Sequence, residues 1–193
     1  SVGNPGFSDR YINFARGNSF IIGKVQGNGS GGISYTSSGG DYAEWFRKEN
    51  INDDLKFGDL VCVNSNGNVI KCTTGAQLLG VISDNPAFIG NASHDEDPNY
   101  ILVGLFGQIN TYVNTQNGTI NPGDFVAASS TPGVATKATK PGHVIGRAIE
   151  GGTMGRINIY VNPTWYDPDV KLTSTGNLGI YDYTVGDPGY TVP

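Results

Sequence analysis

The sequence is poor in charge and in the residues that build most chemical sites. Charged residues make up 15% of its 193 residues, and it holds 2 Cys, 1 Met and 2 His. No window keeps the i, i+3, i+4, i+7 apolar spacing over several turns, which excludes a helical bundle. The longest apolar runs, such as YILVGLF at 100–106, are too short to cross a membrane as a helix. A net charge of −5 without any Lys/Arg cluster argues against a nucleic-acid partner.

The short motifs of common active sites are also missing. The sequence contains no CxxC pair, HExxH, P-loop or GxSxG. His94 lies among acids in NASHDEDPNY, but consecutive acids do not supply the alternating ligands and glycine bend of a calcium loop. We therefore expect a solvated acidic loop there, a structural role for His143, and neither a metal nor a cofactor.

Glycine and small polar residues are abundant instead. The 29 Gly, together with many Asn, Ser and Thr, are typical of an all-β protein with many tight turns. A chain of this length can bury a sizeable core. The sequence begins at Ser1 without a signal peptide, so we expect a fragment or a processed product.

An internal repeat is the most informative pattern. Residues 55–82 align with residues 120–149, with one extra residue in the second hairpin. The matched positions are Gly58-Asp59 with Gly123-Asp124, Gly67 with Gly133, Lys71 with Lys137, Thr73 with Thr139, and Gly80 with Gly146. The repeat predicts a compact β-barrel-like or β-clip-like domain with an internal duplication. The Gly-Asp pairs are turn signals; the alternative is a pseudo-symmetric acid pair.

Three regions follow from composition. We expect a fibre-shaft-like segment over 1–40, the duplicated domain over 41–166 and an extension over 167–193, with a long polar loop at 84–99. The first region has too few apolar residues for a core of its own, so they need a partner surface: Phe20, Ile22, Val25, Ile33 and Tyr35. The same segment of neighbouring subunits is the simplest partner, which predicts an intertwined homotrimer or a higher assembly. The alternative is that this segment docks on the chain's own barrel.

The two cysteines flank a predicted hairpin, VNSNGNVIK. A two-residue turn at Asn66-Gly67 places Cys62 opposite Lys71 and the two cysteines on opposite faces. A three-residue loop centred on Gly67 places Cys62 opposite Cys72 and allows a disulfide. The sequence leaves both registers open.

The stretch TSSGGDYAEWF at 36–46 is the candidate chemical site. A serine in a glycine-flanked turn can approach the carbonyl of its preceding peptide bond, and a nearby acid can assist proton transfer. Ser38, Asp41 and Glu44 therefore suit an N–O acyl shift and self-cleavage of the Ser37–Ser38 bond. The alternative is an ordinary polar turn entering a strand.

These residues resemble a known family. SGGDYAEWF is similar to the S-G-A-D-Y-A-E-Y-F signature of the phage-type peptidase G2 domain, an intramolecular chaperone autoproteolytic domain of tail-spike, appendage and fibre proteins. LLGVISDNPAFIGNASHDED and PGDFVAASSTPGVATKAT extend the similarity, which covers about 18–166. The resemblance implies a β-rich trimerisation module, with Ser38 as nucleophile and Asp41 and Glu44 assisting in members that cleave themselves. Ser37 stands where we expect Asn in those members.

We therefore expect a structural domain of a trimeric virion or cell-surface appendage, with self-cleavage second. A third hypothesis is a receptor- or glycan-binding tip, because aromatic residues near polar loops can stack on sugars. Its candidate residues are Trp45, Trp165, Tyr166, Tyr181, Tyr183 and Tyr190. Three N-glycosylation sequons, at Asn28, Asn91 and Asn117, are expected to be chance matches in an Asn-rich chain.

Overall fold

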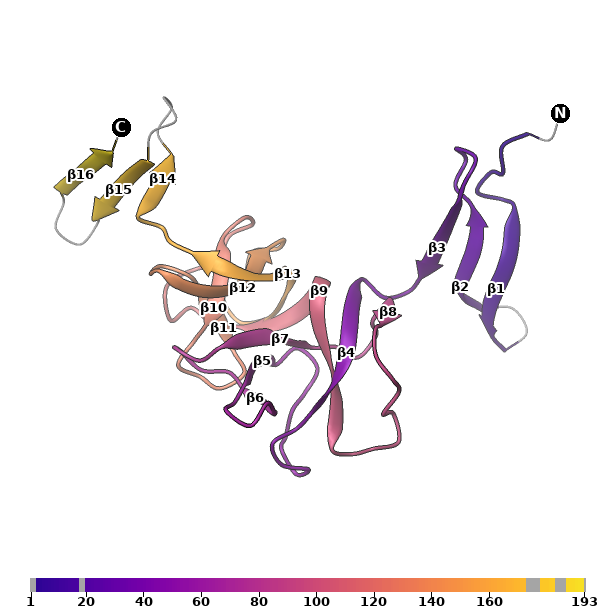
Figure 1. The fold of residues 1–193 in the computed structure, drawn as a ribbon, viewed down its shortest axis with the longest axis horizontal. Helices are drawn as coiled ribbons and strands as arrows, with labels where there is room; N and C mark the ends of the chain where they lie inside the picture. The colour runs from indigo at the N-terminus through magenta and orange to yellow at the C-terminus, as the bar shows by residue number, and fades with distance from the viewer. Residues whose placement is uncertain (1–2, 18–19, 173–177, 183–186, 193) are drawn as a thin grey trace.

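The computed structural model describes residues 3–17, 20–172, 178–182 and 187–192. Their strands form three sheets in which most neighbouring strands are antiparallel (Figure 1). No helix occurs in these residues, so the prediction of an all-β fold is confirmed. In the same residues there is consequently no helical segment that is long and apolar enough to span a membrane.

Each terminal region forms a small sheet and the middle of the chain forms a large one. The N-terminal sheet contains β1 (Arg10–Arg16), β2 (Phe20–Gly27) and β3 (Ile33–Ser37). The C-terminal sheet contains β14 (Val170–Leu172), β15 (Leu178–Asp182) and β16 (Asp187–Val192). The central sheet contains β4 (Asp41–Arg47), β5 (Leu60–Val63), β6 (Val69–Lys71), β7 (Leu78–Ile82), β8 (Phe88–Ile89), β9 (Tyr100–Val113), β10 (Phe125–Ala128), β11 (Ala135–Lys137), β12 (Gly142–Ala148) and β13 (Gly155–Tyr166). The predicted division into three domains stays a prediction.

Strand β9 joins the two halves of the central sheet. Its first half pairs with β4 and its second half pairs with β13. The partner changes at Gly107, which lies opposite Asp41 on one side and opposite Val161 on the other. Gly107 has a φ of +114°, and a Cβ there would clash with the Gly40 carbonyl oxygen. Only glycine fits this crossover.

Each half closes into a small barrel-like ring that contains one repeat. The first ring runs β4-β9-β7-β5-β6 and closes through a parallel bridge between Lys48 and Val69. The second ring runs β9-β13-β12-β10-β11 and closes through a parallel bridge between Ala135 and Val113. The predicted internal duplication is therefore present in the strand order as well as in the sequence.

The Gly-Asp pairs form matching turns in the two rings. Gly58 and Gly123 have φ values of +91° and +90°. The Asp59 carboxylate accepts a hydrogen bond from the Lys56 N–H (2.8 Å) and forms an ion pair with the Lys71 ammonium (3.0 Å). In the second copy, the Asp124 carboxylate likewise accepts a hydrogen bond from the Asn121 N–H (2.8 Å) and forms an ion pair with the Lys137 ammonium (2.8 Å). These contacts support the turn interpretation of both aspartates.

The core follows the same division. A small cluster in the first ring is built from Val61, Val69, Ile82 and Val103. A larger cluster extends through the second ring and includes Leu60, Val126, Ile145, Ile159 and Val161. Alternating strand positions supply these side chains, because successive residues of a strand point to opposite faces.

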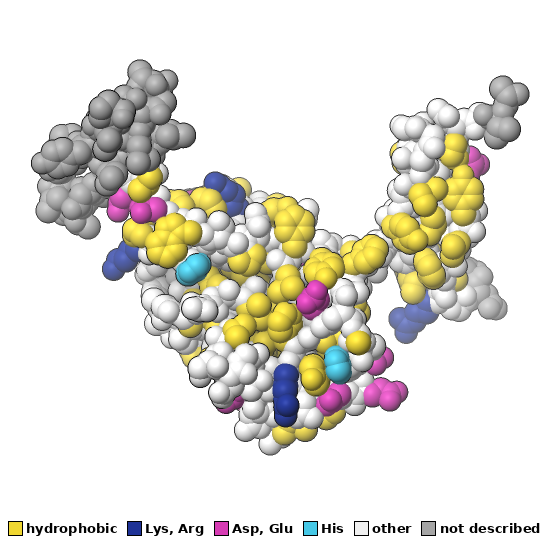
Figure 2. Space-filling model, in the orientation of Figure 1, with side chains coloured by type: hydrophobic (Ala, Val, Ile, Leu, Met, Phe, Trp, Pro, Cys, Tyr) yellow, Lys and Arg dark blue, Asp and Glu magenta, His cyan; other side chains and the backbone are white. Residues whose placement is uncertain are grey.

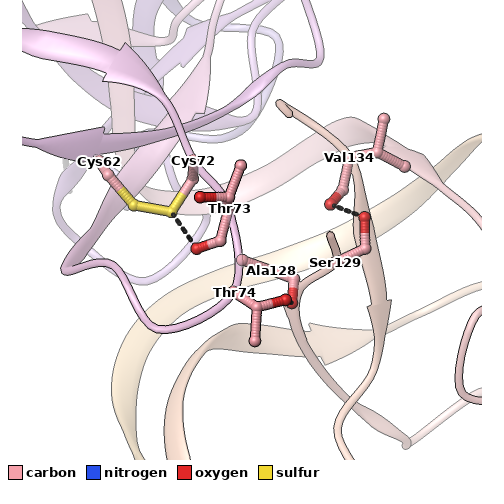
Figure 3. Close-up of a disulfide and its surroundings, with 7 residues drawn as sticks. All are labelled: Cys62, Cys72, Thr73, Thr74, Ala128, Ser129 and Val134. Atoms are coloured by element: carbon pink, nitrogen blue, oxygen red, sulfur yellow. Dashed lines mark hydrogen bonds between the residues drawn. A yellow bond between two sulfur atoms is a disulfide. The ribbon is translucent and has the colours of Figure 1, made fainter. Parts of the chain in front are cut away.

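Cys62 and Cys72 form a disulfide beside the loop between β10 and β11 (Figure 3). Both registers considered from the sequence are wrong. The Asn64 N–H donates to the Asn68 carbonyl (2.9 Å), and Cys62 lies opposite Ile70. The turn is thus centred on Asn66, which leaves the cysteines on one face with their Cα atoms 4.8 Å apart. A cross-link over so short a loop stabilises the fold by about 2–3 kcal/mol.

Candidate functional site

The candidate stretch is the connection between the N-terminal sheet and the central sheet. Strand β3 ends at Ser37, β4 begins at Asp41, and the three residues between them run against residues 83–87. The Ala87 N–H donates to the Asp41 carbonyl (2.7 Å), and the Gln108 N–H donates to the Gly40 carbonyl (3.1 Å). The connection is therefore fixed by backbone bonds from two other parts of the chain.

Gly39 makes the closest approach in this connection. A Cβ at Gly39 would clash with the backbone of Asn85, Pro86 and Ala87. Next to it, the Ser38 hydroxyl lies 3.4 Å from the side-chain oxygen of Asn85, to which it can donate. Ser38 is exposed to solvent. The proposed nucleophile thus lies on a tightly held backbone while its hydroxyl remains accessible.

Asp41 lies inside the protein. Its side chain is 6% exposed, and its Oδ2 atom has no hydrogen-bond partner among the residues that the structure describes. Burial raises the pKa of the Asp41 carboxyl; the Ser83 hydroxyl opposes this rise and the nearby Asp84 carboxylate adds to it. A carboxyl in this environment holds its proton more readily than usual, which suits a proton donor.

Glu44 lies on the other face of β4. Along this strand Asp41 and Ala43 are buried, whereas Tyr42 is exposed and Glu44 is half-buried. The Tyr42 hydroxyl donates to the Glu44 carboxylate, and this bond raises the pKa of the tyrosine. Three residues along a strand span about 10 Å. The structure therefore does not bring Glu44 together with Asp41.

Sequence reasoning missed the second half of the site. Ser83, Asp84 and Asn85 lie beside Asp41 and Ser38, although they are more than 40 positions away in the chain. The signal was present, because SDNPA belongs to the segment that carried the family resemblance. Sequence alone does not connect this segment to Ser38, because their contact forms only in the fold.

The rest of the predicted polar loop also pairs with β4. Residues 84–99 contain the short strand β8, whose Phe88 and Ile89 run parallel to Tyr42 and Ala43, so the prediction of a loop throughout is wrong there. The Asn91 side chain then accepts from the Trp45 N–H (2.8 Å) and donates to the Trp45 carbonyl (2.9 Å). Asn91 extends the β4–β8 pairing with its amide, which gives this sequon a structural role.

The two histidines pack against aromatic rings. His94 stacks on Tyr100 with ring centroids 3.9 Å apart, and His143 meets Trp165 edge to face at 5.2 Å. Within the described part of the chain, no group of three or more His, Cys, Asp or Glu side chains is placed to hold a metal ion.

Comparison with known families gives a match over this region. Residues 9–101 match the family model described as Peptidase_G2, IMC autoproteolytic cleavage domain. The predicted family resemblance is confirmed. The matched segment runs from the N-terminal sheet through the β3–β4 connection and the first repeat to the start of β9. It therefore includes both halves of the candidate site.

Two solved structures resemble the chain more distantly. The C-terminal fragment of bacteriophage phi29 gene product 12 is 19% identical, with a TM-score of 0.47, over 63% of this chain and 100% of the fragment. The pre-mature form of gene product 12 is 20% identical, with a TM-score of 0.47, over 73% of this chain. The chain spans 24% of that longer protein. No curated protein gives a significant match.

The buried carboxyl makes a pH-dependent prediction. The pKa of Asp41 is higher in the folded protein than in the unfolded chain, where it is about 4. The protonated carboxyl therefore contributes its whole stabilising effect below about pH 4. This contribution to the free energy of unfolding is lost as the pH rises through the folded-state pKa. We expect the wild type to lose stability relative to Asp41→Asn as the pH rises from about 4 to about 7. Denaturant unfolding of both proteins at several pH values measures this difference.

Asp124→Asn is the matched control with the opposite sign. Burial raises the pKa of Asp124, but its contacts with Lys137 and Asn121 lower it further than burial raises it. Asp124→Asn should therefore be less stable than the wild type at neutral pH, with a gap that shrinks in acid. Parallel pH curves for the wild type and Asp41→Asn would contradict the assignment of Asp41.

Proposed function

We propose that the chain is an assembly module of a phage-like fibre, spike or surface appendage, and that it associates as a homotrimer through sheet β1–β3. The apolar surface of this sheet carries the proposal. Its exposed side chains are Tyr11, Ile12, Phe14, Phe20, Ile21, Ile22, Ile33 and Tyr35. Among its large apolar residues only Val25, at 5% exposure, is buried.

A sheet of this composition needs a partner. Three short strands can fold stably when an apolar face is covered, but β1–β3 leaves its apolar side chains on view (Figure 2). Monomeric soluble proteins rarely expose so many large apolar side chains on one small sheet. Copies of the same sheet around a rotation axis would bury these side chains against one another, because cyclic symmetry brings identical surfaces together.

The family supports the setting of this assembly. Peptidase_G2 domains, as the sequence resemblance implies, belong to phage appendage and tail-spike proteins. A virion or surface appendage is consistent with the low charge, the many turns and the disulfide, since disulfides persist in oxidising surroundings.

Association is measured by size-exclusion chromatography with light scattering. We expect a trimer mass at micromolar concentration for the wild type. A double variant, Phe20→Ser with Tyr35→Ser, should associate at least about tenfold more weakly, because both residues are largely exposed in one chain and buried in the assembly. Met154→Ser, at a position that is 83% exposed in the central domain, is the control and should leave the mass unchanged. A monomeric wild type would contradict the proposal.

Single-turnover self-cleavage at Ser37–Ser38 is the second candidate. The buried Asp41 carboxyl, close to the tightly packed turn at Ser38 and Gly39, favours this reaction. The Ser38 hydroxyl would attack the Ser37 carbonyl carbon and form an ester, while the departing amide nitrogen takes a proton, for which Asp41 is the candidate donor. Water would then hydrolyse the ester and regenerate the Ser38 hydroxyl with a new carboxylate at Ser37. Glu44 is the proposed third participant.

Intact-mass measurement after prolonged incubation tests this reaction. The expected product is the fragment 38–193, absent from Ser38→Ala and at least about tenfold slower to form in Asp41→Ala. Ser130→Ala, another exposed serine, is the control and should cleave like the wild type. Glu44→Gln tests the third residue separately: cleavage at the wild-type rate would remove it from the site. A wild type that stays intact would eliminate the reaction.

A further inference from the structure

A groove lies where the two repeats meet, away from the β3–β4 connection. It has a volume of about 430 Å³ and is bordered by the β6–β7 loop of the first repeat and the β11–β12 loop of the second. Thr74, Gln116 and Lys140 lie along it, with Trp165 at one side. This volume falls within the range of about 300–1,000 Å³ that is usual for small-ligand pockets.

Trp165 provides a flat apolar surface at this groove. Its side chain is 59% exposed although it lies on the regular strand β13. Its cross-strand partner is His143, whose ring meets the indole at 90°. The indole is thus held in position by a neighbouring ring while much of it remains open to solvent. An exposed, rigid aromatic ring suits stacking against the C–H face of a sugar.

The charge in the groove is of one sign. Its ionisable lining residues are Lys140 and His143, and its lining contains no carboxylate. Lys140 forms no ion pair within the described ranges of the chain. In a protein of net charge −5, this local excess of positive charge favours an anionic ligand.

Gln116 adds an oriented donor. Its side-chain oxygen accepts from the Ser130 N–H (2.8 Å) and from the Ser130 hydroxyl (2.7 Å). These two bonds fix the side chain, and its amide nitrogen donates to no other residue that the structure describes. A donor that is already positioned loses little entropy when it binds a ligand hydroxyl.

We propose that this groove binds an acidic saccharide, with one sugar ring on Trp165, a carboxylate at Lys140 and His143, and a ring hydroxyl at the Gln116 amide. A simple anion would not use the indole, and a neutral sugar would not use the lysine. The proposal does not depend on assembly or on self-cleavage, because neither sheet β1–β3 nor Ser38 contributes to the groove.

The test is an NMR titration of the full chain with trigalacturonic acid. The chain has 2 Trp, so the indole N–H region should contain one signal for Trp165 and one for Trp45; Trp165→Phe identifies the first by its loss. The acid should shift the Trp165 signal saturably. Its methyl ester, which is the same sugar without charge, should bind at least about tenfold more weakly. Acetate at the same concentration should not shift the signal.

Variants separate the contributions of ring and charge. Trp165→Ala should reduce affinity at least about tenfold, read from the ligand's own signals, and it is expected to fold because the side chain is mostly exposed. Lys140→Gln should abolish the preference for the acid over the ester, whereas Lys56→Gln, a lysine outside the groove, should preserve it. The absence of a saturable shift, equal affinity for acid and ester, or an unchanged preference in Lys140→Gln would each overturn the proposal.

Discussion

The hydrogen-bonded ladder of strand β9 holds the two halves of the central sheet together. One strand of 14 residues pairs with β4 and β7 at one end and with β13 at the other. The two copies of the repeat therefore share a strand instead of packing as separate domains. Gly107 permits the change of partner, because no side chain fits between β9 and the start of β4.

The candidate cleavage site is a consequence of this arrangement. Since β4 must lie along β9, the chain entering it from β3 crosses the segment that follows β7. The approach is so close that only glycine fits at position 39. Asp41 is buried at the same crossing. Its carboxyl loses contact with water there, and its Oδ2 atom gains no hydrogen bond from the described residues in return. This closely packed junction, with its buried carboxyl, is where we propose chemistry on the chain's own backbone.

Much of the fold could be predicted from local signals. The Gly-Asp pairs at 58–59 and 123–124 form the expected turns, because their conformation depends on residues within a few positions. The β5–β6 hairpin register could not be predicted in the same way. The Asn64 side chain accepts from the Asn66 and Asn68 N–H groups (2.9 and 3.0 Å), and Cys62 lies opposite Ile70 instead of Lys71, which an Asn66-Gly67 turn predicts. Likewise, the contact between Ser38 and Asn85 joins residues 47 positions apart, which spacing along the sequence does not reveal.

If other copies of the same chain cover sheet β1–β3, as we propose, the protection of this sheet depends on protein concentration. Amide hydrogen exchange, followed by mass spectrometry over a dilution series from high micromolar to nanomolar concentration, measures this dependence. We expect residues 10–37 to be protected at high concentration and to lose protection on dilution, while β9 and β13 exchange slowly throughout. Protection of residues 10–37 that does not change with concentration, in a protein that remains monomeric, would contradict it.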